Sequence, residues 1–448
     1  MSNLYHNFFR EIENETVLFL DNNKVVTAKN LQDEILAIHK VILTYSDAKT
    51  FAICTNNRFL FTAALFAVIY AEKVPIVLGH SKAKLLNEQK ALFDIVLTDH
   101  MIEIESHSIN IDKIVPEDIS ATDYTLFDKN ISDQMVVLMT SGSSSEPKKI
   151  VKSIQDLAVE SEVLIDQWQH LLKNTRVIST VSHLHQYGIT FNILLPLMMK
   201  SPIEIQQLFY QEELAKLSEA EQYVLITSPA FLKRLDKNLQ NNLNFKLIFS
   251  AGGQLGDQAA EDCQHVFNRW PIEIYGSSES GVIAFNQHGI AKQDGFQPFP
   301  QVLVQQFEDD TIKISSPLCE NSAELRLNDR IELMSNGNFR ILGRTDKIVK
   351  IEEKRVSLTE IEVRIKGIID VEHVYAFVLP NKHRDVIGCV IVSQRQSNER
   401  ELISRLTKEL KLLIEPIAVP KRWRFVTEVP MNAQGKISLL ELRELFDD

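Results

Sequence analysis

A loop of small hydroxyl residues follows an apolar run in the first third of the chain. Met135–Met139 is apolar and leads into the sequence Thr140-Ser141-Gly142-Ser143-Ser144-Ser145-Glu146-Pro147-Lys148. An apolar run that ends in Gly, Ser and Thr predicts a strand that opens into a loop of exposed backbone N–H groups. Such N–H groups and hydroxyls can surround a phosphate oxyanion, and Lys148 adds a mobile positive charge. The residue order differs from a Walker A loop, so another kind of phosphate loop is predicted, with a solvated linker as the alternative.

Two further segments carry small residues at the ends of predicted strands. Tyr275-Gly276-Ser277-Ser278-Glu279 follows the predicted strand Ile272–Ile274, and Ser250-Ala251-Gly252-Gly253 ends another strand. A carboxylate at the end of a parallel strand lies where α/β sheets bind ligands, and Glu279 could hold Mg²⁺ against phosphate oxygens. The two glycines would let a flat ligand approach the backbone. A plain surface turn is the alternative for each segment.

The sequence Asn336-Gly337 predicts a hairpin with a two-residue type I′ turn. That turn pairs Met334 with Phe339 beside it, and Asp329 with Arg344 at the open end of the ribbon, on one face. A carboxylate and a guanidinium placed in this way could bind a sugar diol or a phosphate. The alternative is a cross-strand salt bridge worth under ~1 kcal/mol.

Two single residues complete the candidates. His185 opens the sequence His185-Gln186-Tyr187-Gly188 after a predicted strand. It is either an ordinary packed histidine or, with its aromatic neighbour, a wall of an acyl pocket. Lys436 ends the loop Pro430-Met431-Asn432-Ala433-Gln434-Gly435-Lys436. Such a lysine is either solvent-exposed or delivered into a distant cleft when its domain moves.

Alternating strands and helices are predicted to position these residues. The predicted strands are Phe51–Cys54, Val74–Leu78, Ile95–Thr98, Lys149–Lys152, Val177–Val181, Tyr223–Thr227 and Lys246–Ser250. Helices are predicted over Arg58–Ala71, over Ser81–Phe93 and from Ser153, where Asp156 completes a capping-box-like pair. This alternation predicts the α/β class, with parallel sheets covered on both faces. From about residue 300 strands and turns predominate.

Length and charge predict more than one domain and exclude some functions. At 448 residues the chain is too long for one ordinary core. Residues 345–448 carry 18 Lys and Arg against 17 Asp and Glu, whereas the whole chain has a net charge of −12. We therefore predict an acidic N-terminal domain over 1–344 and a small, nearly neutral C-terminal domain over 345–448. The acidic balance argues against a nucleic-acid-binding surface.

Cysteine spacing and apolar runs bear on location. Four separated cysteines, with no C-x-x-C pair, are typical of reduced thiols in the cytoplasm rather than of a disulfide framework or a zinc site. The N-terminus lacks the basic start and apolar core of a signal peptide. The longest apolar run, Phe59–Ala71, is too short to span a bilayer and predicts a buried helix. We therefore expect a cytoplasmic protein without a membrane span.

Taken together, the motifs resemble those of the adenylate-forming, or AMP-binding, superfamily of acyl- and aryl-CoA synthetases, adenylation domains and luciferases. The resemblance covers essentially the whole chain. Thr140–Lys148 is similar to T-S-G-S-T-G-x-P-K, Tyr275–Glu279 to Y-G-x-T-E, Asp329 to the end of T-G-D, Gly343–Lys350 to G-R-x-D-x-x-x-K, and Pro430–Lys436 to P-x-x-x-x-G-K. It implies a large N-terminal domain of α/β subdomains, with parallel and mixed sheets and a small β-rich part, and a small mobile α+β C-terminal domain.

The resemblance also implies roles in binding ATP and Mg²⁺. Asp329 and Arg344 would hold the ribose hydroxyls, which agrees with their pairing in the predicted hairpin. The residues around the phosphates would be Thr140, Ser141, Gly142, Ser143 and Lys148. Those that border adenine would be Gly252, Gly253 and Tyr275.

The catalytic candidates are Lys436, Glu279, Ser278 and His185. By resemblance, Glu279 would bind Mg²⁺, Ser278 would lie near the α-phosphate, and Lys436 would bridge the substrate carboxylate and the α-phosphate. Asp346 would be the hinge about which the small domain rotates to withdraw Lys436 after the first step.

The implied reaction is carboxylate activation in two steps. A carboxylate attacks the α-phosphorus of MgATP, which releases pyrophosphate and leaves an acyl-adenylate. A pantetheine thiol, of CoA or of an acyl carrier protein, then accepts the acyl group. The His185 region lacks the F-D-x-S pattern of amino-acid-activating relatives, which favours an acyl or aryl acid.

Several positions depart from the family's pattern. Ser144-Ser145 stands where Thr-Gly is usual, Asn328 replaces the Gly before Asp329, and Glu353 replaces a Gly of the segment that lines the thiol tunnel in the family. These departures leave open a catalytically impaired, nucleotide-binding regulatory relative as the alternative function. No residue favours a luciferase-like oxygenase.

Two basic clusters bear on the thiol-carrying partner. Lys382-His383-Arg384 and Lys421-Arg422-Trp423-Arg424 both fall in the predicted small domain. They would either dock an acidic carrier protein or form ordinary solvated surface.

Overall fold

A computed structural model defines the fold. It describes residues 4–21, 24–140, 148–238, 242–289, 295–318, 324–344, 347–351, 354–369, 371, 373–379, 385–393, 398–414, 416–430 and 438–447. The predictions for Ser141, Gly142, Ser143, Asp346 and Lys436 lie outside these residues, as do the departures at Ser144, Ser145 and Glu353.

The chain divides into two compact units. The first unit comprises Met1–Val304, Ile314–Leu325 and Ser335–Asn338, and the second comprises Gln305–Lys313, Arg326–Met334 and Phe339–Asp448. Each unit is described below by itself.

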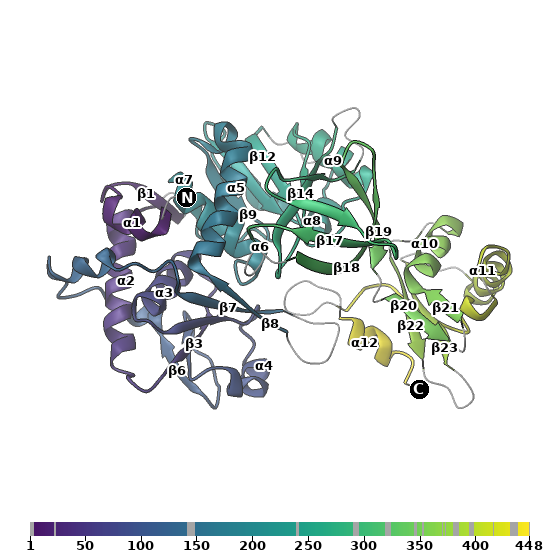
Figure 1. Cartoon of the computed structure of the whole chain (residues 1–448), viewed down its shortest axis with the longest axis horizontal. Helices are drawn as coiled ribbons and strands as arrows, with labels where there is room; N and C mark the ends of the chain where they lie inside the picture. Colours follow the sequence, from purple (N-terminus) through teal and green to yellow (C-terminus); the bar gives the residue numbers. More distant parts are fainter. Residues whose placement is uncertain are drawn as a thin grey trace. The chain divides into compact units, whose positions relative to one another are not determined.

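A six-stranded sheet in the first unit carries the predicted phosphate loop between its last two strands (Figure 1). Its order is β6-β5-β3-β4-β7-β8, parallel at every step except the antiparallel pair β7 and β8. The strands are β3 (Thr50–Cys54), β4 (Val74–Val77), β5 (Ile95–Thr98), β6 (His107–Asn110), β7 (Met135–Thr140) and β8 (Lys148–Ser153).

Three helices belong to this part of the first unit: α2 (Ala28–Leu43), α3 (Arg58–Tyr70) and α4 (Ala83–Glu88). Every residue of α3 except Phe59 is buried, so the prediction of a buried helix there is confirmed. The single helix predicted over Ser81–Phe93 is wrong in extent, because α4 ends at Glu88 and a separate 3₁₀ turn covers Lys90–Leu92. No helix among the described residues is long and apolar enough to cross a bilayer.

A nine-stranded sheet forms the rest of the first unit's framework. Its order is β15-β14-β13-β12-β11-β9-β10-β1-β2, parallel from β13 to β1 and antiparallel at both edges. The strands are β1 (Val17–Asp21), β2 (Lys24–Thr27), β9 (Arg176–Ser179), β10 (Ile203–Glu204), β11 (Gln222–Thr227), β12 (Asn244–Ser250), β13 (Ile272–Ser277), β14 (Gly281–Gln287) and β15 (Gln297–Pro298).

Helices cover both faces of this sheet, as the alternation of elements predicts. They are α1 (Leu4–Glu11), α5 (Ile154–Leu172), α6 (Gln186–Gly188), α7 (Leu195–Met199), α8 (Pro229–Leu232) and α9 (Asp257–Phe267). Successive strand residues point to opposite faces. On β12, Phe249 packs against Trp168 of α5, with ring centroids 4.9 Å apart, whereas Ile248 joins an apolar cluster with α9 residues such as Val266.

Helix α5 begins where the sequence predicts. Ser153 is its N-cap: the Ser153 hydroxyl accepts a hydrogen bond from Asp156 N at 3.0 Å, and Asp156 Oδ2 accepts one from Ser153 N at 2.8 Å. This reciprocal pair satisfies two backbone donors that the helix leaves unpaired. The predicted capping box is confirmed.

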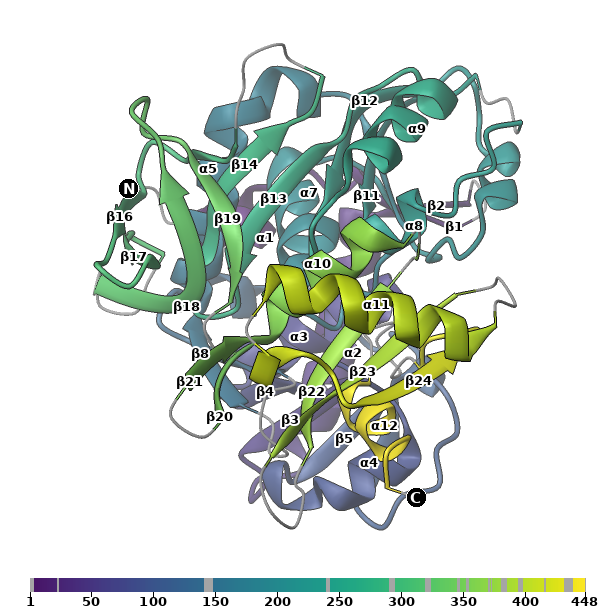
Figure 2. The ribbon, with the colours of Figure 1, turned by 90° about the vertical axis from the view of Figure 1, so that its right-hand side faces the viewer.

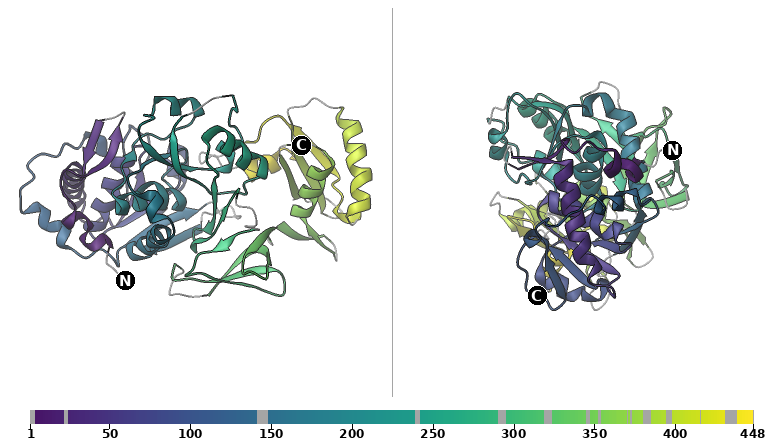
Figure 3. Two further views of the ribbon diagram at one scale, coloured as in Figure 1. Left: turned by 90° about the horizontal axis from the view of Figure 1, so that it is seen from above. Right: turned by 90° about the vertical axis from the view of Figure 1, so that its left-hand side faces the viewer.

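The second unit contains most of a hairpin sheet and a small α+β core (Figures 2 and 3). The sheet order β16-β17-β18-β19 joins β16 (Leu303–Gln306), β17 (Thr311–Ser315), β18 (Glu324–Leu333) and β19 (Phe339–Arg344). The remaining elements are β20 (Ile348–Ile351), β21 (Lys354–Ser357), α10 (Leu358–Ile368), β22 (His373–Leu379), β23 (Val386–Val392), α11 (Glu399–Leu413), β24 (Arg422–Val426) and α12 (Leu439–Glu444). The sheet β22-β23-β24 packs against α10 and α11 around buried residues such as Ile365, Ile391 and Leu406.

The β18–β19 hairpin corrects the predicted turn. Leu333, not Met334, pairs with Phe339, and Gly337 has φ +84° whereas Asn336 is not among the described residues with positive φ. A type I′ turn needs positive φ at both central residues, so that prediction is wrong. A register shift between Arg330 and Ile331 then restores the predicted partner of Asp329, which is Arg344.

We predict that Ser153→Ala lowers the free energy of unfolding by about 1 kcal/mol, because the first turn of α5 loses its side-chain acceptor. Urea denaturation followed by tryptophan fluorescence measures the change. Ser153→Asp keeps an acceptor and is the matched control. Equal stability of Ser153→Ala and the wild type would contradict this account of the helix start.

Candidate functional site

The strands β7 and β8 bring the two ends of the predicted phosphate loop together. They pair antiparallel, and the last pair in register is Thr140 with Lys148. The residues on either side of the predicted loop, Thr140 and Lys148, are therefore neighbours in the sheet. Lys148 stands at this point with its side chain 58% exposed and forms an ion pair with Glu279.

Glu279 lies on a tight turn between β13 and β14, and glycine makes that turn possible. A Cβ on Gly276 would lie 2.4 Å from the carbonyl oxygen of Gly281, a backbone atom, so no larger residue fits without moving the strands. The register of β13 and β14 shifts at this position, between Tyr275 and Gly276. The sequence Tyr275–Glu279 thus ends a strand and presents a carboxylate, as predicted.

The charge state of Glu279 suits an ionic site. Partial burial would raise the pKa of this carboxyl, but the hydrogen bond and charge of Lys148, with other hydrogen bonds, lower the pKa below its ordinary value. Glu279 is therefore a carboxylate at neutral pH. An exposed Lys–Glu pair contributes only about 0–1 kcal/mol, so both charges can be redirected to a ligand at little cost.

The donor set fits Mg²⁺ bound together with phosphate. The described residues contain no group of three or more His, Cys, Asp and Glu that could hold a metal by themselves. Mg²⁺ commonly takes one or two carboxylates, with phosphate oxygens and water as its other ligands. A single ionised carboxylate beside the end of a predicted phosphate loop matches that pattern.

The predicted adenine-binding segments share the carboxyl edge of the nine-stranded sheet. Ser250, the last residue of β12, pairs with Glu273 of the neighbouring parallel strand β13. Gly252 follows with φ +88°, and no described atom lies within 4 Å of where its Cβ would stand. The ring of Tyr275 packs on that of Phe296, with centroids 5.7 Å apart. These segments occupy the edge where open α/β sheets bind ligands.

His185 precedes a short helix that is tied to the same strand ends. It is the N-cap residue of α6, and Tyr187 follows two residues later. The Tyr187 hydroxyl donates to the carbonyl oxygens of Thr227 (3.2 Å) and Phe249 (3.0 Å), at the ends of β11 and β12. Burial raises the pKa of Tyr187 well above its usual value, although the hydrogen bond to Thr227 opposes the rise. Its ring contacts Phe191, with centroids 4.7 Å apart, in a π-helical segment over Ile189–Leu194.

Asp329 and Arg344 belong to the second unit. They are directly opposite each other in the β18–β19 register, which confirms the predicted pairing. Their binding roles stay predictions, as do those of the other candidate residues.

Two buried charged side chains next to the Glu279 turn were not predicted from the sequence. They are Lys152 on β8 and Glu160 on α5, 4% and 3% exposed. A signal was present, because Glu160 stands three residues after Leu157 and four before Leu164, on the apolar face of its helix. Lys152 likewise shares the buried face of its strand with Ile150.

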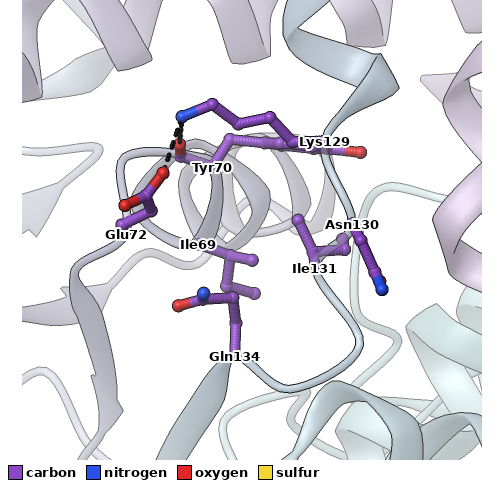
Figure 4. A pocket seen from close by; sticks show the side chains of 7 residues that line it. All are labelled: Ile69, Tyr70, Glu72, Lys129, Asn130, Ile131 and Gln134. Atoms are coloured by element: carbon purple, nitrogen blue, oxygen red, sulfur yellow. Dashed lines mark hydrogen bonds and ion pairs between the residues drawn. The ribbon is translucent and has the colours of Figure 1, made fainter.

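Two surface hollows of the first unit lie away from the predicted site residues. The hollow in Figure 4 has a volume of about 180 Å³, and in it Lys129 forms an ion pair with Glu72 at 2.8 Å. The second, of about 340 Å³, is bordered by the buried ion pair of Arg176 and Glu204. Neither hollow is lined by a candidate catalytic or nucleotide-binding residue.

Comparison with protein families identifies the class to which this chain belongs. The model of the AMP-binding enzyme family matches residues 11–311, and the chain belongs to that family. The resemblance inferred from the motifs is thereby confirmed.

Individual relatives agree with this class. The chain is 24% identical over 304 residues to 4-coumarate–CoA ligase of Cereibacter sphaeroides. This alignment covers 67% of the chain and 69% of the relative. It is also 24% identical over 417 residues to bacitracin synthase 3 of Bacillus licheniformis. That alignment covers 82% of the chain but only 6% of the much longer relative.

Solved structures share the fold. o-Succinylbenzoate CoA synthetase from Bacillus subtilis, in complex with its acyl-adenylate intermediate, superposes with a TM-score of 0.80 at 15% identity, over 100% of this chain and 98% of that one. ATP-bound MatB from Rhodopseudomonas palustris superposes with a TM-score of 0.78 at 18% identity, over 100% and 99%. The predicted α/β fold, with a large N-terminal and a small C-terminal part, is confirmed.

We predict that Gly276→Ala lowers the free energy of unfolding by about 1–3 kcal/mol, because the new methyl group would collide with the Gly281 carbonyl oxygen. Urea denaturation measures the loss. Gly256→Ser is the control, since Gly256 is an N-cap with φ −77° and open space where a Cβ would stand. If Gly276→Ala were as stable as Gly256→Ser, the tight-turn account would be wrong.

Proposed function

We propose that the chain is an ATP-dependent carboxylate ligase, an acid–thiol ligase that activates an acyl or aryl carboxylic acid as acyl-AMP. One observation carries the proposal. Lys148, at the end of the predicted phosphate loop, forms an ion pair with Glu279 of the Y-G-S-S-E turn, within a chain that belongs to the AMP-binding enzymes. The two charges that ATP and Mg²⁺ require are therefore already side by side.

The first step is attack of the substrate carboxylate on the α-phosphorus of ATP, with pyrophosphate as the leaving group. Lys148 exchanges its partner Glu279 for a phosphate oxygen, and Glu279 becomes available to Mg²⁺. Bound Mg²⁺ would supply positive charge that offsets the charge of the phosphates. The rate comes from positioning and charge neutralisation, because the protein forms no covalent bond in this step.

The other candidate residues complete the nucleotide site in this proposal. Ser278 lies near the α-phosphate, and the open space at Gly252 supports a flat adenine beside Tyr275. The pairing of Asp329 with Arg344 supports their joint contact with the ribose hydroxyls. The loop donors are Thr140, Ser141, Gly142 and Ser143.

We propose a pantetheine thiol as acceptor in the second step, carried by CoA or by an acyl carrier protein. The thiol sulfur attacks the acyl carbonyl carbon and AMP leaves. The names of the relatives support both carriers: one is a CoA ligase, and another, D-alanine–D-alanyl carrier protein ligase of Bacillus licheniformis, is 30% identical over 112 residues. The aromatic residues Tyr187 and Phe191 after His185 support an acyl or aryl substrate.

We further propose that residues 345–448 act as a mobile domain that rotates about Asp346. This segment has an apolar core of its own, formed by residues such as Ile361, Ile391 and Leu410. Rotation would bring Lys436 to the α-phosphate for adenylation and withdraw it for thiolation. A cytoplasmic location stays a prediction; the described cysteines, Cys54, Cys263 and Cys389, are free and buried.

We predict ATP–pyrophosphate exchange that depends on a carboxylic acid from an acyl and aryl panel, because adenylation is reversible. Incorporation of labelled pyrophosphate into ATP is the measurement. The same panel with CoA and with a phosphopantetheine-bearing carrier protein then identifies the acceptor. Tight ATP binding without exchange for any acid would instead favour the alternative, a catalytically impaired nucleotide-binding regulatory protein.

We predict that Lys436→Ala abolishes adenylation and largely spares thioester formation from supplied acyl-adenylate, because the lysine acts only in the first step. Exchange assays and single-turnover thiolation measure the two steps separately. Lys411→Ala, an exposed lysine of α11, is the matched control and should leave both steps unchanged. Equal loss of both steps would refute this division.

A further inference from the structure

Two oppositely charged side chains are buried beneath the turn that carries Glu279. Lys152 is 4% exposed and Glu160 is 3% exposed. Buried charges are costly, and proteins keep them only where hydrogen bonds or charged partners compensate. Neither residue is a candidate ligand for the nucleotide. Their role is therefore inferred from the groups with which they form hydrogen bonds.

Lys152 holds the main chain of Glu279. Its Nζ donates to the carbonyl oxygen of Glu279 at 2.7 Å and to that of Leu318 at 2.8 Å. Lys148, four residues earlier on the same strand β8, pairs with the Glu279 carboxylate. Two lysines of one strand therefore fix one residue, one through its side chain and the other through its backbone.

Glu160 holds the other end of the same turn. Its Oε1 accepts from the backbone N of Val282 at 3.0 Å. A Cβ on Gly281 would lie 3.0 Å from this same oxygen, and Gly281 has φ +67°. Glycine at position 281 thus allows both the turn and the close approach of the carboxylate.

The second oxygen of Glu160 reaches the segment that begins at His185. Oε2 accepts from Gln186 Nε2 at 2.7 Å and from the Thr190 hydroxyl at 2.8 Å. Burial raises the pKa of Glu160, while the hydrogen bond from Thr190 and the charge of Lys152 oppose the rise. One buried carboxyl group thereby joins the Glu279 turn to the proposed acyl-binding segment.

General stabilisation explains this arrangement less well than positioning does. Apolar side chains of similar volume often stabilise a protein interior as well as buried charges do. Among the described residues, the hydrogen bonds of both charged groups go to the Glu279 turn, to Leu318 and to the two residues Gln186 and Thr190. Such a specific set of partners fixes geometry at a site.

We propose that Lys152 and Glu160 are positioning residues that clamp the turn Glu279–Val282 from within and couple it to the His185–Gly188 segment. The clamp holds the Glu279 carboxylate ready for the metal–phosphate site and keeps that site in register with the acyl-binding segment. The positioning itself stands on the hydrogen bonds, whereas its use in catalysis rests on the proposed function.

Hydrogen–deuterium exchange of the full chain tests the clamp without any assay of activity. Lys152→Met and Glu160→Leu should make the amide hydrogens of 279–283 exchange about tenfold faster, the change produced by ~1.4 kcal/mol in the opening free energy. Glu160→Gln keeps one acceptor for Val282 N and should restore most of the protection. Lys149→Met, an exposed neighbour on β8, is the matched control and should exchange like the wild type.

The Mg²⁺ dependence of ATP–pyrophosphate exchange tests the use of the clamp. Lys152→Met should raise the half-saturating Mg²⁺ concentration about fivefold, and Lys149→Met should not, because only the former releases the main chain of Glu279.

Unchanged amide exchange in both Lys152→Met and Glu160→Leu would overturn the clamp. Should either variant fail to fold, the other decides by the same peptide, since faster exchange there supports the clamp and wild-type protection opposes it. Faster amide exchange with an unaltered Mg²⁺ dependence would overturn the proposed catalytic use. Absence of pyrophosphate exchange in the wild type would refute the ligase proposal alone, and the amide measurement would still decide the clamp.

Discussion

The contact between Lys148 and Glu279 is the constraint on which the first unit's site depends. It joins two residues that are 131 positions apart, Lys148 at the start of β8, directly after the predicted phosphate loop, and Glu279 in the turn after β13. The pair is partly exposed and weakly held, so its value lies in placement rather than stability. A lysine and a carboxylate kept in this way can turn toward a phosphate and a divalent cation with little reorganisation.

The surrounding structure explains why that contact can form. Gly276 allows β13 and β14 to approach closely enough for a short turn, and the pairing of Thr140 with Lys148 holds the two ends of the predicted phosphate loop next to each other. Beneath the turn, Lys152 and Glu160 form hydrogen bonds with its main-chain groups. Two buried charged side chains therefore support the site from the interior, and the close approach and pairing of the strands support it from the sheet.

Local features were predictable from sequence, and tertiary ones were not. The capping box at Ser153 depends on residues three apart, and the strand before Glu279 is defined by its own apolar run. The predicted hairpin register is correct at Asp329 but wrong at Phe339. The turn differs from the predicted one, and a register shift near Ile331 cancels the resulting offset before Asp329. Sequence reasoning passed over Glu160, since its partners Gln186 and Val282 are far away in the chain and a charged residue is usually solvated.

The measurement that tests the central claim most directly is the Mg²⁺ dependence of ATP binding to Glu279→Gln, determined by calorimetry beside the wild type. If Glu279 holds the ion against the phosphates, Mg²⁺ should strengthen ATP binding to the wild type and have little effect on the variant. The same enhancement by Mg²⁺ in both proteins would contradict the account, because the carboxylate beside Lys148 would then have no part in binding the metal–nucleotide complex.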